Sequence, residues 1–196
     1  MQSEYRKFRA VLLHTSVATL CCLAVGFIFY QFDVFNIYHP ALSFLVLGLT
    51  GSLFFFTLRE LGWRTAWALL FAALVAHTGL LTRALEHGTL MRDIGTFAGL
   101  ALAVALFYYK FYRGHDPKRL VNPLLLGGLW ASTNLVFMAL VGVIRGYFIN
   151  TPFLSVPWGL LPMVQYGFLV GLGVGIGILV AEHLEPRLRL LLRKRP

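Results

Sequence analysis

The chain has 196 residues, of which 58% are hydrophobic and 13% charged, and its formal net charge is +9. Soluble domains usually contain about 25% charged residues, so this composition excludes an ordinary soluble domain and indicates a polytopic membrane protein. Six apolar windows approach or exceed the roughly 20 residues that a transmembrane helix needs: 10–30, 41–58, 64–83, 94–111, 121–144 and 158–183. We therefore expect an all-α fold, with a six-helix transmembrane bundle over 1–184 and a basic cytoplasmic tail over 185–196.

The positions of the basic residues predict the topology. If the N-terminus is cytoplasmic, fourteen of the 17 Lys and Arg residues lie in inner segments, and this bias favours a cytoplasmic location for both termini. These residues are Arg6, Lys7, Arg9, Arg59, Arg64, Lys110, Arg113, Lys118, Arg119, Arg187, Arg189, Arg193, Lys194 and Arg195. We interpret the basic tail as an anchor to anionic headgroups. The lipid bilayer of a prokaryotic inner or plasma membrane is thus an expected partner, and nucleic acid is not.

Short polar segments separate the first three windows. His14 lies near the inner end of the first window, and the following outer segment contains His39. Pro40 precedes the second window, at a position where the first turn of a helix tolerates proline. Gly62 and Trp63 form a predicted tight turn before the third window.

Polar residues around the outer ends of windows three to five form a candidate solute pathway. The outer group contains Arg83, Glu86, Arg92, Asp93 and Arg145, and the deeper group contains His77, Asn134 and Gln165. Polar side chains at membrane depth usually face a bundle interior or a wet cavity. The sequence therefore predicts a polar vestibule that leads to a site near the midplane, and the alternative is a set of interfacial ion pairs and isolated hydrogen bonds between helices.

The last window is rich in glycine at helical spacing. Gly167, Gly171, Gly173, Gly175 and Gly177 form overlapping pairs four residues apart, a spacing that lets two helix backbones approach closely in lipid. We expect these glycines to pack against another helix of the same chain. The alternative is a partner protein, or a second copy of this chain, bound through the same helix.

The histidines raise the question of haem or metal binding. Our main expectation is that the protein binds no cofactor. At a rise of about 1.5 Å per residue, His14 lies about 6 Å from the inner end of its helix and His77 about 20 Å along its own, so the two do not share one haem. The alternative sets are His14 with His183 and Glu182 near the inner surface, and His77 with His39 or His87 near the outer surface. These residue types suit a metal or a haem iron.

Three short matches in the same order suggest an internal repeat. Residues 23–32 resemble 102–111, His39-Pro40 resembles Asn122-Pro123, and 67–70 resembles 158–161. Each half would contain three spans, so the halves would be inverted in the membrane, as in many transporters. The alternative is chance similarity between apolar segments.

No paired carboxylates, activated nucleophile or metal motif indicates an intramembrane enzyme. The function that we expect is transport or permeation of a small solute, by the chain alone or as the membrane-embedded subunit of a transport system. The alternatives are a non-catalytic accessory subunit of a larger membrane complex and a haem-binding redox subunit.

Overall fold

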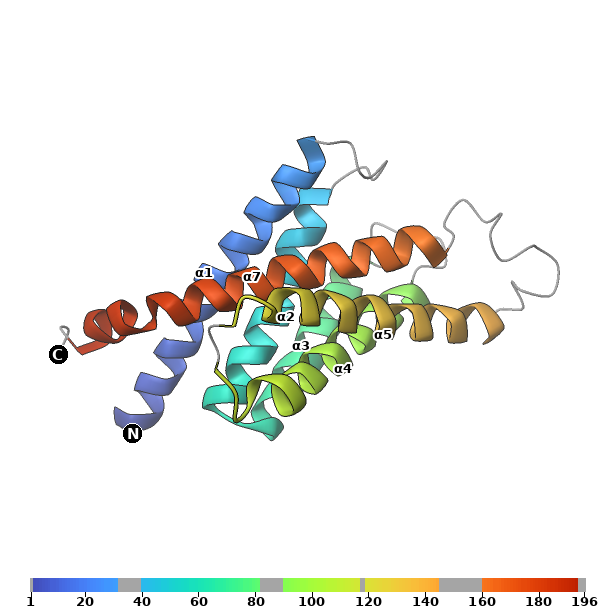
Figure 1. The fold of residues 1–196 in the computed structure, drawn as a ribbon. Coiled ribbons are helices and arrows are strands. Elements are labelled where there is room, and N and C mark those ends of the chain that lie inside the picture. Colours follow the sequence, from blue (N-terminus) through green and yellow to red (C-terminus); the bar gives the residue numbers. More distant parts are fainter. Residues whose placement is uncertain (1, 32–39, 82–89, 117–118, 145–159, 194–196) are drawn as a thin grey trace.

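The fold is described from a computed structural model, which covers residues 2–31, 40–81, 90–116, 119–144 and 160–193. These ranges form six helices, and a π-helical segment continues the fourth (Figure 1). The elements are α1 (Gln2–Gln31), α2 (Pro40–Glu60), α3 (Trp63–Leu81), α4 (Leu90–Leu106), η1 (Phe107–Tyr112), α5 (Asn122–Ile144) and α7 (Leu160–Arg193). The all-α expectation is confirmed, with one helix in each apolar window.

Two helices are long and apolar enough to cross a membrane. Within the described residues these stretches are Glu4–Phe29 in α1 and Val164–Arg187 in α7. Shorter apolar stretches are Trp63–Val75 in α3 and Thr96–Tyr112 in α4 and η1. The six-span topology, its orientation and the inverted repeat stay predictions.

Glycines with a positive φ make the turns that follow α2 and η1. Gly62 ends α2 with a φ of 89°, in the left-handed region that glycine adopts most easily. The backbone N–H of Gly62 donates to the Thr57 carbonyl at 2.9 Å, and α3 starts at the next residue. Gly114, with a φ of 88°, makes a similar turn after η1.

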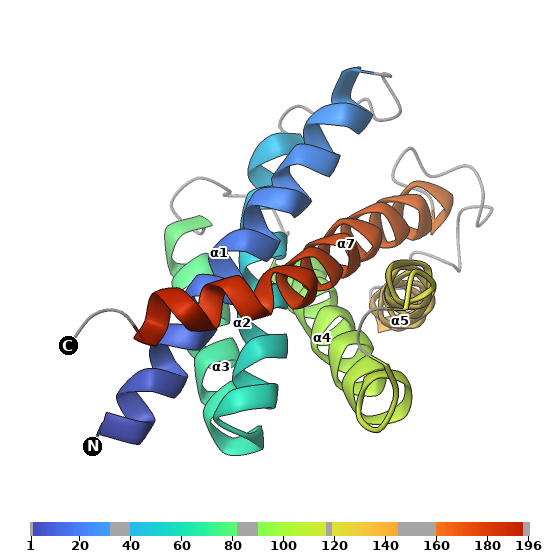
Figure 2. The same cartoon turned by 60° about the vertical axis from the view of Figure 1, so that its left-hand side comes forward.

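Helix α7 lies at the centre of the bundle. It packs against α1, α2 and α5, whereas α3 packs against α2 and α4 at the edge (Figures 1 and 2). The first turn of α1 and the last turn of α7 lie at the same end of the molecule (Figure 1). Helix α7 also continues past the predicted end of the bundle, through Pro186, to Arg193.

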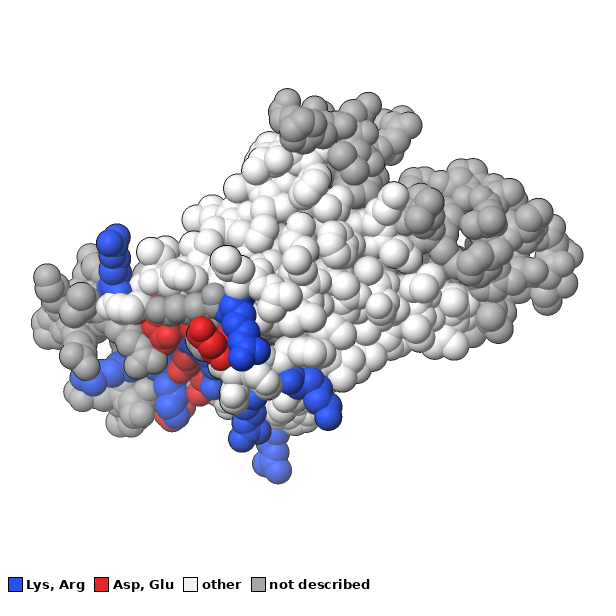
Figure 3. Space-filling model, in the orientation of Figure 1, with Lys and Arg blue, Asp and Glu red and all other residues white. Residues whose placement is uncertain are grey.

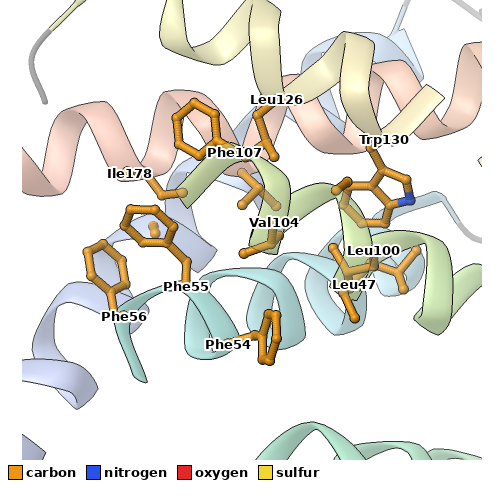
Figure 4. Close-up of a cluster of buried hydrophobic side chains, with 14 of the residues drawn as sticks. Leu47, Phe54, Phe55, Phe56, Leu100, Val104, Phe107, Leu126, Trp130 and Ile178 are labelled. Atoms are coloured by element: carbon orange, nitrogen blue, oxygen red, sulfur yellow. The ribbon is translucent and has the colours of Figure 1, made fainter. Parts of the chain in front are cut away.

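The core between α2, α4, α5 and α7 is aromatic and aliphatic. Phe54, Phe55 and Phe56 of α2 are each at most 1% exposed, and Phe107 and Trp130 are fully buried (Figure 4). Hydroxyl groups also make hydrogen bonds between helices. The Thr133 hydroxyl of α5 donates to the Gly99 carbonyl of α4 at 2.8 Å, and the Thr19 and Ser52 hydroxyls, in α1 and α2, lie 3.2 Å apart. These bonds satisfy polar groups that lipid cannot.

Candidate functional site

Charged side chains in the described part of the chain gather at one end of the molecule (Figure 3). Most of them are basic, but at this end a group of ion-paired side chains that includes three carboxylates lies partly inside the bundle. We call this group the Arg59 cluster, and its members come from α2, η1 and α7: Arg59, Glu60, Tyr112, Glu182 and Glu185.

Arg59 joins the end of α2 to α7. Its Nη1 donates to Oε1 of Glu182, and its Nη2 lies 3.6 Å from Oε1 of Glu185. Nε of Arg59 also donates to Oε1 of the adjacent Glu60 at 2.8 Å. The side chains of Arg59 and Glu182 are 13% and 3% exposed, so both partners of this ion pair are largely removed from solvent.

Tyr112 makes a second contact to the same carboxylate. Its hydroxyl donates to Oε1 of Glu182 at 2.6 Å, a length typical of a hydrogen bond to an ionised acceptor. In this contact the phenol donates and the carboxylate accepts, because an ionised carboxylate has no proton to donate. The Arg59 guanidinium keeps its charge, since arginine is not deprotonated in proteins.

Tyr112 is the last residue of the π-helical segment η1. A π turn adds a residue to the helical repeat and so changes the direction of the side chains that follow it, and such turns often occur at functional sites. Arg113 follows the segment as its C-cap, and its N–H donates to the Tyr108 carbonyl at 2.8 Å in an i to i−5 bond. The local sequence Phe-Tyr-Tyr-Lys-Phe-Tyr thereby presents both Tyr112 and Tyr108 to the ring of Phe55.

Aromatic rings separate the cluster from the apolar core. The Tyr112 ring lies edge-on to Phe55, with ring centroids 4.9 Å apart, and Phe55 also contacts Phe107 in the core (Figure 4). The Arg59 guanidinium carbon lies 5.1 Å from the centre of the Phe56 ring. This apolar surrounding strengthens the electrostatic attraction within the cluster, because it excludes water.

His14 of α1 lies against the same aromatic layer. Its ring centroid is 5.2 Å from that of Phe56, and the side chain is almost completely buried. Nδ1 lies 2.7 Å from the Ala10 carbonyl, so this nitrogen carries the proton and donates to the backbone. Within the described residues Nε2 has no hydrogen-bond partner. The ring of His14 therefore lies in the bundle interior with only one of its two nitrogens hydrogen-bonded to a described residue.

The contacts in the Arg59 cluster join three elements through a single charged group. One carboxylate, Glu182, accepts from two donors on two other elements, so neutralising it would weaken the contacts of α7 with both α2 and η1 and leave Arg59 paired only with Glu185 of α7. A buried ion pair of this kind contributes little net stability because of the cost of desolvation, but losing one partner is costly. The arrangement can therefore link a proton or a cationic group to separation of helices at this end.

Two residues of the predicted pathway have described side chains, and these two side chains differ in burial. Asn134 is 1% exposed in α5, where it lies beside Gly167 of α7. Gln165 is exposed on α7. The side chains of His77, Arg83, Glu86, Arg92, Asp93 and Arg145 lie outside the described residues, so the vestibule stays a prediction.

The inner histidine set is spread over two environments. His183 is exposed, and its Nδ1 lies 2.9 Å from the Leu179 carbonyl, whereas Glu182 is buried with Arg59. In the described ranges no three His, Cys, Asp or Glu side chains gather as metal ligands. His39, His77 and His87, the proposed outer set, lie outside the residues whose side chains are described.

The five glycines of α7 contact two other helices of the chain. A Cβ on Gly175 would lie 2.5 Å from the Cα of Pro123, and Gly171 abuts Gly127, both in α5. Gly167 also faces α5, at Asn134 and Ala131. On the other side, Gly173 abuts Cys22 and Gly177 abuts Ala18, both in α1. A partner protein bound through α7 stays a prediction, and these glycine contacts are made within the chain.

The sequence interpretation missed the Arg59 cluster because it assigned Arg59 only to the inner basic segments. One signal was present: Glu182 is the first charged residue after a long apolar run that begins at Trp158. A carboxylate at that position needs a buried cation or several hydrogen-bond donors. Comparisons of the chain with models of known protein families, with curated proteins and with solved structures find no match.

Proposed function

We propose that the protein is an integral membrane protein that moves a small solute across the bilayer, alone or as the membrane-embedded subunit of a transport system. In this proposal all six helices cross a prokaryotic inner or plasma membrane with both termini in the cytoplasm. The buried Arg59–Glu182 pair is the observation that carries the proposal. Ionisable groups within transmembrane bundles are costly and usually mark substrate or ion pathways.

The position of the pair supports a role in opening one end of the bundle. Arg59 lies in the last turn of α2, Tyr112 ends η1, and Glu182 lies one turn before the proline of α7. All three elements converge on one carboxylate, so its neutralisation or its capture by a solute cation would weaken the contacts among them together. Alternating access in transporters consists of such rocking or gating of one group of helices against another.

Uptake into proteoliposomes tests the proposal. Purified protein would be reconstituted, incubated with a defined mixture of small metabolites and ions, and the internal solutes identified by mass spectrometry against empty liposomes. We expect at least one solute to accumulate, and Glu182→Gln to reduce its initial rate about tenfold or more, which corresponds to about 1.4 kcal/mol. The matched control is Glu4→Gln, which removes an exposed carboxylate of α1.

The same assay includes the deeper polar residues. Asn134→Leu, Gln165→Leu and His77→Leu would each alter the rate if the predicted vestibule leads to the site. Wild-type liposomes that accumulate no more than empty ones, with and without any protein that co-purifies from the native membrane, would contradict transport. A stable heteromeric complex without flux would instead support the accessory-subunit alternative, and a Soret band in the purified protein would support the redox alternative.

A further inference from the structure

A second feature lies on α3, away from the Arg59 cluster. Four large apolar side chains occur at every fourth position, and all are exposed: Trp63 by 48%, Trp67 by 38%, Phe71 by 67% and Val75 by 53%. Residues four apart lie on the same face of a helix. Ala66 and Leu70, which border the stripe along one edge, are buried against the bundle. An apolar stripe therefore runs along the outer face of α3.

An aromatic group forms one end of this stripe. The rings of Trp63 and Trp67 are 5.1 Å apart at their centroids, and Trp63 lies 6.0 Å from Tyr109 of η1. Phe54 of α2 supports Trp67 from behind, at 5.4 Å. Tryptophan and tyrosine concentrate at the level of lipid headgroups, so this end of the stripe matches the membrane interface.

Two basic residues flank the aromatic group. Arg64 follows Trp63 in sequence and Lys110 follows Tyr109, so the contact between the two rings brings both bases to the same region. Both are exposed, and in the described part of the chain neither forms an ion pair. Arg59, by contrast, is held by three carboxylates. The stripe thus ends near two bases, and no carboxylate in the described part of the chain pairs with either of them.

We propose that this surface binds an anionic phospholipid, with its phosphate between Arg64 and Lys110 and an acyl chain along Trp67, Phe71 and Val75. The charge pattern favours an anionic lipid over a neutral partner helix, because only an anion gains attraction to both bases. The length of the stripe suits an acyl chain, since four positions spaced by four residues cover about 18 Å at 1.5 Å per residue. The site rests on the proposed membrane location of the chain, but not on transport of a solute.

Native mass spectrometry of the full chain, with phosphatidylglycerol or phosphatidylcholine added to the detergent, tests the site. We expect the wild type to retain one phosphatidylglycerol in preference to phosphatidylcholine. A base near a charged surface contributes about a fivefold change in affinity, so Arg64→Gln/Lys110→Gln would lower the affinity for phosphatidylglycerol about thirtyfold. The control Arg6→Gln/Arg119→Gln removes two bases from other exposed positions and would leave the retained lipid in place.

Two further ligands, added in the same experiment, distinguish binding of a whole phospholipid from binding of other molecules to this surface. Dihexanoyl phosphatidylglycerol has the same headgroup but short chains, and we expect it to bind more weakly because the stripe stays uncovered. Inorganic phosphate would not displace the long-chain lipid. Equal retention of both headgroups, an unaffected double variant, or displacement by inorganic phosphate would overturn the proposal. An oligomer that Phe71→Ala dissociates would also overturn it, because a protein surface would then cover the stripe.

Discussion

Helices α7 and α3 occupy equivalent places in the predicted two-fold repeat, yet they are packed in opposite ways. Helix α7 lies between α1, α2 and α5, and its glycines contact neighbours on two sides. Helix α3 buries Ala66 and Leu70 on one side and exposes bulky rings on the other. Both helices are apolar, so hydrophobicity alone does not distinguish them.

The difference shows what would determine the position of each helix in the proposed membrane bundle. Lipid tails are as apolar as leucine, so burying an apolar side chain against another helix brings no hydrophobic gain. Small residues allow close backbone contact, and buried polar groups require partners. Helix α7 has five glycines that contact its neighbours and the buried Glu182 near its end, whereas α3 has one glycine, Gly79. The predictions below test this explanation.

The largest expected effect comes from breaking the ion pair that holds α7. Arg59→Leu leaves the Glu182 carboxylate buried without its cation, and removing one partner of a buried pair costs about 3–5 kcal/mol. Unfolding in mixed SDS micelles measures this loss. The double variant Arg59→Leu/Glu182→Leu removes both charges and would recover most of the stability. A single variant as stable as the wild type would show that the pair does not hold α7.

The next effect tests the glycine contacts. A Cβ at Gly175 would lie 2.5 Å from the Cα of Pro123, and a backbone atom cannot rotate away. Gly175→Val is therefore expected to cost about 3 kcal/mol, the upper end of the usual overpacking range, measured by the same unfolding assay. The matched control is Gly128→Val in α5, where a Cβ meets no atom within 4 Å. Equal losses at both positions would refute close packing as the cause.

A smaller loss is expected from the second donor to Glu182. Tyr112→Phe keeps the ring against Phe55 and removes only the hydroxyl that donates to the carboxylate at 2.6 Å. A hydrogen bond to a charged group contributes about 1.5 kcal/mol or more, and thermal unfolding in detergent would show the loss. Tyr109→Phe, an exposed neighbour in the same π segment, is the control and should change the melting temperature little.

The smallest effect should come from the exposed face of α3. Phe71 is 67% exposed, so Phe71→Ala is expected to change the free energy of unfolding by less than about 0.5 kcal/mol. Leu70→Ala, at the adjacent position that faces the bundle, removes a buried side chain and would cost about 2 kcal/mol or more. A ranking in the opposite order would mean that the outer face of α3 is covered by another protein surface.

The sequence was sufficient for features that depend on local pattern. Six apolar windows predicted six helices, because helix length and apolar composition are properties of each segment by itself. The turn at Gly62 followed from the small set of residues that adopt a positive φ. The glycine spacing of α7 predicted close packing. The structure places Gly167, Gly171 and Gly175 against α5, and Gly173 and Gly177 against α1.

Tertiary structure alone decided which distant residues meet. Arg59 and Glu182 are separated by 123 positions, and the sequence showed one as an inner base and the other as an acid at the end of an apolar run. Tyr112 joins them only because η1 is π-helical, a local departure from the α-helical repeat that no residue pattern indicated. Helix formation is specified segment by segment, whereas the pairing of buried charges depends on how the helices pack. The sequence therefore determined the all-α class of the fold, and packing determined the candidate site.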